Sequence, residues 1–196
     1  MKIVSTTEEN KIEKRIAITP EIVKKYVSQG FQVSLPPNYG LHLGFKDQDF
    51  KSQGANFIDS EKDLIQGGDI IVQLGLPSDD KLEYFKENQT LIGILNPFTN
   101  EEKIKNLLKK KINNFSLELL PRITRAQSMD ILSSQANLAG YKAVIEAFAN
   151  FEKAIPMMMT AAGTVPAAKV LVVGAGVAGL QAIAAAKRMG AIVFAT

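Results

Sequence analysis

The run Val170-Leu171-Val172-Val173 is followed at once by Gly174-Ala175-Gly176-Val177-Ala178-Gly179, and this stretch decides the fold of the C-terminal region of the chain. An apolar strand, a Gly-x-Gly-x-x-Gly turn and a helix over Leu180–Gly190 follow one another. A second apolar strand is expected at Ala191–Thr196. This strand–turn–helix–strand order is the context in which the glycine pattern predicts dinucleotide binding.

Each glycine of this loop has its own expected role. Gly174 permits the tight turn, Gly176 lets a pyrophosphate approach the backbone, and Gly179 lets helix and strand pack closely. The N–H groups at the start of the helix would then face the phosphates. A carboxylate for the adenosine ribose is expected about 20 residues further on, which falls just past Thr196. We therefore expect residues 166–196 to be the beginning of a Rossmann nucleotide-binding domain, and an incomplete one.

The composition is that of an ordinary globular protein, and it excludes several kinds of chemistry. Of 196 residues, 46% are apolar and 22% charged, and the net charge is only +3. Nucleic acid is not an expected partner, because the one run of basic residues, Lys109–Lys111, fits the last turn of a helix better. The absence of cysteine and the single histidine, His42, exclude thiolate chemistry and multi-histidine metal sites. No leader peptide is expected, and Val170–Ala186, with 17 uncharged residues, is shorter than the ~20 that span a bilayer.

The first 120 residues alternate short apolar runs with amphipathic segments, which is typical of an α/β domain with a parallel sheet. The clearest helix begins at Thr19-Pro20-Glu21, with a hydroxyl N-cap and a proline at the first helical position, and it ends at Gly30. We expect residues 1–127 to form this Rossmann-like domain. The expected strands are Lys2–Ser5, Phe31–Leu35, Ala55–Ile58, Asp69–Leu74, Thr90–Leu95 and Asn114–Leu119.

A long amphipathic stretch, Ser128–Phe151, predicts a helix that connects the two domains. The segment that follows carries prolines, a glycine and Met157-Met158-Met159, which we interpret as adaptable packing. Residues 128–165 are therefore expected to be a connecting helix and linker.

A dense group of polar side chains lies between the last strand of the first domain and this helix. One interpretation is a helix N-cap, with Ser128 or Gln127 starting the helix and Asp130 complementing its dipole. The other is a ligand site, in which arginine, amide and carboxylate groups hold a carboxamide such as that of nicotinamide. The group comprises Arg122, Arg125, Gln127, Ser128, Asp130 and Ser133.

At this point the chain resembles a known family. The run from Pro121-Arg122-Ile123-Thr124-Arg125 to Gly140-Tyr141 looks like the signature of the NAD(H)-binding component of proton-translocating NAD(P) transhydrogenases. The run Met157–Pro166, the glycine loop and Gly190-Ala191-Ile192-Val193 also fit that family, and the similarity covers the whole chain. The family's component is roughly twice this length, so the chain resembles its N-terminal half.

The resemblance implies a site, a reaction and partners. Arg122, Gln127, Asp130 and Ser133 would contact the nicotinamide end of NAD(H), and Gly174, Gly176, Val177 and Gly179 would form the pyrophosphate loop. Hydride would pass directly from NADH to NADP⁺, which a partner component binds, coupled to proton movement through a membrane-spanning domain. The component would be a homodimer on the cytoplasmic face of the membrane, attached through its complex and not inserted.

Alanine dehydrogenase, a relative that shares the Arg15–Pro20 motif, is the main alternative. Its pattern has a lysine and a histidine where this sequence has Gln73 and Asn96, and neither amide can act as an acid or base near neutral pH. Arg15 would bind an anionic ligand group or pair with a surface acid. A further alternative is a catalytically incomplete binding module, because the strands Val170–Val173 and Ala191–Ala195 would lack sheet neighbours. We expect the 196-residue chain by itself to be inactive.

Overall fold

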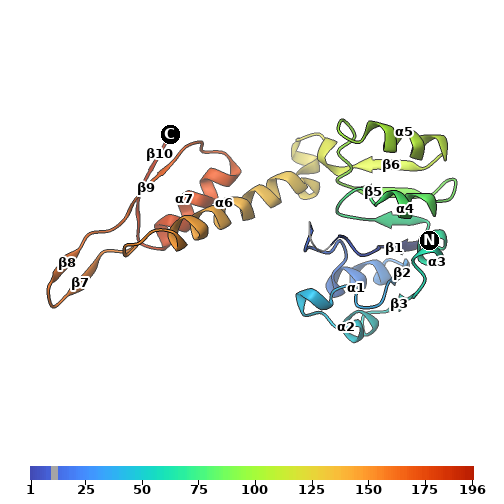
Figure 1. Ribbon diagram of the computed structural model, residues 1–196, viewed down its shortest axis with the longest axis horizontal. Helices are drawn as coiled ribbons and strands as arrows, with labels where there is room; N and C mark the ends of the chain where they lie inside the picture. The colour runs from blue at the N-terminus through green and yellow to red at the C-terminus, as the bar shows by residue number, and fades with distance from the viewer. Residues whose placement is uncertain (10–12) are drawn as a thin grey trace. The chain divides into compact units, whose positions relative to one another are not determined.

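The computed structural model describes residues 1–9 and 13–196, and it divides the chain into two compact units (Figure 1). Unit 1 is Met1–Pro121 and unit 2 is Arg122–Thr196.

Unit 1 is built on a six-stranded sheet in which every described pairing is parallel. The strand order is β3-β2-β1-β4-β5-β6, so the order reverses beside β1 and continues from β4, which makes a doubly wound Rossmann-like sheet. The strands are β1 (Lys2–Val4), β2 (Gln32–Leu35), β3 (Ala55–Phe57), β4 (Ile70–Val72), β5 (Thr90–Gly93) and β6 (Asn113–Ser116). The α/β parallel sheet expected from the sequence is confirmed.

Two apolar cores lie on the two faces of this sheet. Successive strand residues point to opposite faces, and accordingly Ile3 packs in one core and Val4 in the other. The core around Ile3 contains side chains of α1 and α2, and the core around Val4 contains side chains of α3, α4 and α5. The helical elements of unit 1 are α1 (Pro20–Ser28), η1 (Leu41–Leu43), α2 (Asp47–Lys51), α3 (Glu61–Gln66), α4 (Asp79–Glu83), α5 (Glu101–Lys109) and η2 (Leu117–Leu119).

The start and end of α1 test the sequence signals. The helix begins at Pro20, as predicted, and Gly30 follows it in the left-handed region with φ +86°. Thr19 is the N-cap residue, as predicted, but within the described part of the chain its side chain makes no capping hydrogen bond. The fixed φ of proline suits the first turn and its missing N–H would have no helical partner, so Pro20 favours a helix start at this position.

Unit 2 contains two helices packed together and two small sheets (Figure 1). Its elements are η3 (Thr124–Met129), α6 (Ile131–Ala149), β7 (Met158–Thr160), β8 (Gly163–Val165), β9 (Lys169–Val172), α7 (Val177–Arg188) and β10 (Ile192–Ala195). Strands β9 and β10 pair in parallel with α7 as their crossover, which confirms the predicted βαβ unit. Val144 of α6 packs with Ala185 and Ala186 of α7 in the core of this unit.

Two expectations from the sequence, one in each unit, are wrong. The three methionines, interpreted as adaptable packing, are exposed, and Met158 and Met159 lie in one strand of an antiparallel hairpin, β7–β8. Met157, Met158 and Met159 have exposed fractions of 62%, 46% and 83%. Likewise, the strand expected over Asn114–Leu119 ends at Ser116 and continues as the 3₁₀ turn η2.

Candidate functional site

The glycine loop between β9 and α7 has the backbone geometry that its sequence predicts. Gly174 has φ +93°, which favours glycine, and its N–H donates to the Thr196 carbonyl at 2.7 Å. Gly176 is the N-cap of α7, and no described atom lies within 4 Å of where its Cβ would be. The loop is therefore open at the start of the helix, where backbone N–H groups and the helix dipole favour an anion.

Gly179 allows a different close approach from the one expected. An added Cβ there would lie 1.8 Å from the Gly174 carbonyl oxygen, whereas the nearest strand atom, on Val172, would be 3.7 Å away. The glycine is thus required by the turn itself and not by packing of the helix on the strand. Val177, the first residue of α7, has a partly exposed side chain beside the open loop.

The start of α6 is capped by Asp130, not by Ser128 or Gln127 as one interpretation had it. The Asp130 Oδ1 accepts from the backbone N–H of Ser133 at 2.9 Å, and Oδ2 accepts from the Ser133 hydroxyl at 2.6 Å. These two hydrogen bonds, led by that of the hydroxyl, lower the pKa of the Asp130 carboxyl, and the charge of Arg122 lowers it further. Asp130 is therefore an anion held in a fixed orientation at neutral pH.

Three of the four residues expected to contact nicotinamide line one hollow. Arg122, Gln127 and Asp130 surround a hollow of about 220 Å³ together with Ile123 and Thr124. Ser133, the fourth, is tied to Asp130 by both of the capping hydrogen bonds. Arg125 and Ser128 are exposed and do not line this hollow. The capping and ligand-site interpretations are therefore compatible, because Asp130 caps α6 and also borders the hollow.

A second concave region lies in unit 1, where β1 and β4 end at the point at which the strand order reverses. This crevice of about 620 Å³ is lined by Thr7, Glu8, Gln73 and Lys81, among others. Such switch points are where open α/β sheets usually bind ligands. Here the groups are engaged with one another: the Lys81 ammonium donates to the Thr7 carbonyl at 2.7 Å and pairs with Glu61 at 2.7 Å.

Gln73 is the centre of a buried hydrogen-bond network in this crevice. Its side chain is 3% exposed and hydrogen-bonds to the hydroxyls of Ser5 and Thr6. With the amide oriented to satisfy both of its ends, its nitrogen also donates to Glu8 Oε1 at 3.2 Å. Glu8 in turn accepts from the Leu74 N–H at 2.6 Å, and burial raises the pKa of its carboxyl. The sequence carried no signal for Glu8 or Lys81, because the contacts of Glu8 with Leu74 and of Lys81 with Thr7 join residues more than 60 positions apart in the chain.

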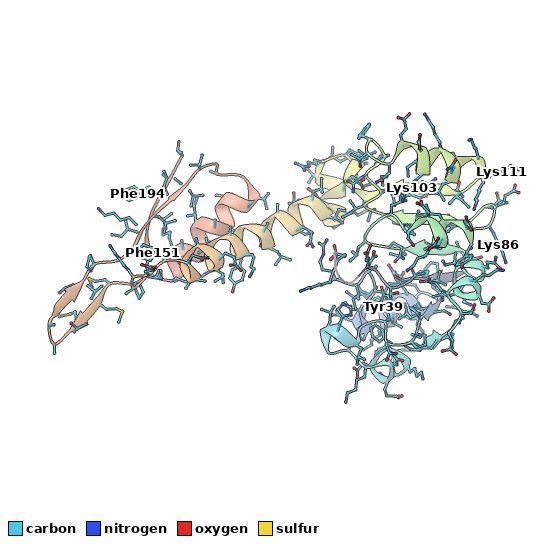
Figure 2. All side chains as sticks on the ribbon, in the orientation of Figure 1. Tyr39, Lys86, Lys103, Lys111, Phe151 and Phe194 are labelled. Atoms are coloured by element: carbon cyan, nitrogen blue, oxygen red, sulfur yellow. The ribbon has the colours of Figure 1, made fainter. Side chains whose placement is uncertain are left out.

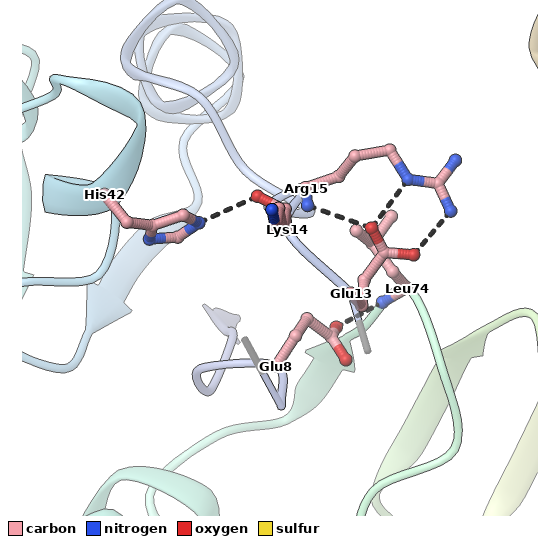
Figure 3. Close-up of polar contacts among 6 residues, drawn as sticks. All are labelled: Glu8, Glu13, Lys14, Arg15, His42 and Leu74. Carbon is pink, nitrogen blue, oxygen red and sulfur yellow. Dashed lines mark hydrogen bonds and ion pairs between the residues drawn. The ribbon is translucent and has the colours of Figure 1, made fainter. Parts of the chain in front are cut away.

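Arg15 forms an ion pair beside this crevice (Figure 3). Its guanidinium donates to both carboxylate oxygens of Glu13, at 2.8 and 2.6 Å. These contacts lower the pKa of Glu13 and raise that of Arg15. The expected pairing of Arg15 with an acid is confirmed. His42 lies in η1, and its ring Nε2 is 2.7 Å from the Lys14 carbonyl oxygen (Figure 3).

Asn96, the second amide of interest, follows β5 in the left-handed region with φ +46°. Its backbone N–H donates to Glu118 at 2.6 Å, and its side chain is exposed. Among the described residues, no group of three or more His, Asp or Glu side chains could hold a metal ion. In residues 1–9 and 13–196, none of the helices has the length and apolar character needed to cross a membrane.

Two family models match successive regions of the chain. Residues 5–139 match the N-terminal domain of the alanine dehydrogenase/PNT family, and residues 143–196 match its C-terminal domain. The second match covers the βαβ unit that carries the glycine loop.

Known relatives and solved structures agree with these matches. The chain is 47% identical to the first part of the NAD(P) transhydrogenase subunit alpha of Rickettsia prowazekii, over 98% of this chain and 51% of that protein. A crystal structure of transhydrogenase from Sinorhizobium meliloti superposes with a TM-score of 0.93 at 47% identity, covering 98% of this chain and 58% of that one. The alanine dehydrogenase of Methanococcus maripaludis is 29% identical over 91% of this chain and 48% of that protein. The chain thus spans about half the length of the curated relatives it matches.

Proposed function

The chain belongs to the alanine dehydrogenase/PNT family, and we propose that it is a portion of the NAD(H)-binding component of a proton-translocating NAD(P)⁺ transhydrogenase. The reaction is direct hydride transfer from NADH to NADP⁺. The higher identity to a transhydrogenase subunit, 47% against 29% to an alanine dehydrogenase, supports this choice between the two activities in the family.

The observation that favours a transhydrogenase over an alanine dehydrogenase is that Gln73 is a buried amide. Oxidation of an amino acid needs a group that accepts a proton, and the dehydrogenase pattern places a lysine at this position. Gln73 does not titrate, and it is buried and hydrogen-bonded to Ser5 and Thr6. Asn96, at the position of the dehydrogenase histidine, does not titrate either. Hydride transfer between two nicotinamides exchanges no proton at the reacting carbons and needs neither group.

The residues of unit 2 have the roles of binding and orientation in this proposal. The open backbone at Gly174–Gly179 binds the pyrophosphate at the N-terminus of α7. Arg122, Gln127 and Asp130 hold the carboxamide, with Ser133 fixing the Asp130 carboxylate. The bound dinucleotide supplies the hydride from its nicotinamide ring. The protein's contribution is to align that ring and exclude water, which are positional effects that do not require an acid or base.

Partners follow from the same proposal. A separate component binds NADP(H) and is joined to a membrane-spanning domain, which couples hydride transfer to proton translocation. The NAD(H)-binding component is a homodimer at the cytoplasmic face of the membrane and is peripheral through its complex. The Rickettsia relative is named as one piece of a divided subunit alpha, and that name supports the existence of such partners.

Two activity assays on the native complex test which reaction it catalyses. With NADH and an NADP⁺ analogue of distinct absorbance, reduced analogue should appear without any keto acid or ammonia. The alternative, an alanine dehydrogenase-like activity, requires NADH oxidation that depends on pyruvate and ammonia. Turnover with pyruvate and ammonia and none with the analogue would refute the transhydrogenase proposal.

We also propose that the 196-residue chain by itself binds NADH weakly and is inactive. The sheet that carries the loop has two strands, β9 and β10, and Leu171 and Phe194 on them are 67% and 54% exposed. A sheet of two strands is marginally stable in water. A fluorescence titration of this chain that gave low-micromolar affinity would contradict the proposal and favour a self-sufficient binding module.

A further inference from the structure

The two halves of the proposed dinucleotide site lie at the starts of two different helices. The nicotinamide-side group surrounds the N-cap of α6 at Asp130, and the pyrophosphate loop leads into α7 at Gly176. A dinucleotide that contacts both halves requires that α6 and α7 keep a fixed relative position. The contact between these two helices within unit 2 therefore matters for alignment, not only for stability.

The two helices approach closely at Gly140. An added Cβ on Gly140 would lie 2.0 Å from the Ala178 carbonyl oxygen, 2.7 Å from its carbonyl carbon and 2.9 Å from its Cα. The backbones of the two helices thus touch directly, in the first turn of α7 beside the glycine loop. One turn away, the Asn137 amide donates to Gln181 Oε1 at 3.4 Å across the same contact.

The helix α6 can transmit this position to the nicotinamide side because it is one continuous helix from Ile131 to Ala149. Asp130 and Gly140 are ten residues apart, which is about 15 Å along a helix axis. No proline or second glycine interrupts α6 between them. A shift at Gly140 is therefore passed to the Asp130 end and is not absorbed locally.

We propose that Gly140 is a positioning residue that sets the distance between the nicotinamide-side group and the pyrophosphate loop. This inference rests on the function proposed above. Real Cβ atoms essentially never come closer than 3.0 Å to such neighbours, so a methyl group at 2.0 Å must shift α6 relative to α7, with its glycine loop, by at least 1.0 Å. A displacement of that size in a site built on alignment can reduce a rate by about a hundredfold. Helix propensity alone would give the opposite expectation, since alanine is a better helix former than glycine.

The substitution Gly140→Ala in the native complex tests this role with two readouts. One is the rate of hydride transfer per bound NADH, and the other is the affinity for NADH and for ADP-ribose, which lacks nicotinamide and contacts only the pyrophosphate side. We expect the rate to fall about tenfold or more, while both dissociation constants stay within about threefold. The matched control is Ala139→Ser, which adds one heavy atom at the exposed neighbouring position and should leave both readouts at the wild-type level.

Two results would overturn the proposal. One is an unchanged rate per bound NADH, and the other is a parallel tenfold loss of affinity for both ligands, which would indicate local damage to the glycine loop. If Gly140→Ala does not fold, Asn137→Ala decides the matter, since it removes a contact between the helices without adding atoms. It should slow transfer about two- to threefold with unchanged ADP-ribose affinity, and an unchanged rate would overturn the role of Gly140.

The failure of the proposed function is a separate outcome. It appears in the wild-type complex as turnover with pyruvate and ammonia and no transfer to an NADP⁺ analogue. The rate per bound NADH can then be measured on that reaction, and the comparison of Gly140→Ala with wild type still decides whether Gly140 aligns the two halves.

Discussion

Replacing Gly176 with alanine should weaken dinucleotide binding while leaving the stability of the protein nearly unchanged. The backbone of Gly176 has φ −75° and ψ −169°, an extended conformation that alanine adopts freely. No described atom lies within 4 Å of the added Cβ. The folded state therefore gains no clash, and the loss of conformational freedom in the unfolded chain raises the free energy of unfolding by about 0.4–1 kcal/mol. Gly176 is also the N-cap of α7, where alanine is less favourable than glycine by a similar amount. The two effects offset each other, so the net free energy of unfolding should change little.

The effect on binding is larger than the effect on stability. The space beside Gly176 is the approach that the proposed pyrophosphate uses, and a methyl group there displaces the phosphate from the N–H groups of α7. Loss of one hydrogen bond to a charged group costs about 1.5–3 kcal/mol, which corresponds to a decrease in NADH affinity of about ten- to a hundredfold.

Thermal unfolding of the full-length protein with and without NADH measures both effects in one assay. Without ligand the midpoint should change little, and with NADH the ligand-induced increase should shrink. The control is Gly75→Ala in unit 1, where the nearest atom to the added Cβ, Glu8 Oε2, is 3.8 Å away. This control should leave NADH affinity unchanged. Wild-type NADH affinity in the Gly176→Ala variant would refute the assignment of this backbone to the pyrophosphate.

Three further predictions concern other regions of the chain. Asp130→Asn keeps a good N-cap residue, and either this substitution or Gln127→Ala should slow hydride transfer about tenfold while NADH affinity changes less than threefold. Equal losses of the stopped-flow rate and of the affinity measured by titration would contradict the orienting role of these side chains. Gln89, 5% exposed, bonds to two backbone carbonyls at 2.6 Å and one N–H at 2.7 Å. Gln89→Leu should therefore lower the free energy of unfolding by about 3 kcal/mol in urea, whereas exposed Gln48→Leu should not. Burial raises the pKa of Tyr39 (Figure 2) to about 12. The stability that this raised pKa contributes is therefore complete below pH 10, and about 2–3 kcal/mol of it is lost as the pH rises toward 12. Tyr39→Phe should show a flatter decline in urea midpoint over that range, and a decline identical to that of the wild type would contradict the raised pKa.

The strands and the glycine loop could be predicted because their signals are local. Apolar runs bounded by turn residues located the six described strands of unit 1, with ends that differ by three residues at most. Gly174 and Gly30 were identified correctly because a positive φ at a turn or helix end strongly favours glycine. The strand end at Ser116 was missed, since Leu117 and Leu119 continue the apolar run into a 3₁₀ turn.

The hairpin and the close helix contact could not be predicted in the same way. The turn of β7–β8 is Ala161-Ala162, which lacks the Asn-Gly or Gly-Gly pair that marks two-residue hairpins, and the methionines before it do not alternate with polar residues. The clash that an alanine would make at Gly140 depends on Ala178, which is distant in sequence. The group around Asp130 was found from its polar density, but its cap was assigned to the wrong residue because several hydrogen-bonding side chains compete there.

The place of β1 in the sheet has a consequence for biosynthesis. This strand is made before the other strands of its sheet, yet it lies between β2 and β4, and its register with Ile70 and Ile71 needs a segment made almost 70 residues later. At about 5–20 residues per second, β1 waits roughly 4–14 s for that neighbour. During this interval one edge of the nascent β1–β2–β3 sheet is unpaired. A translational pause before β4 would lengthen the exposure of that edge.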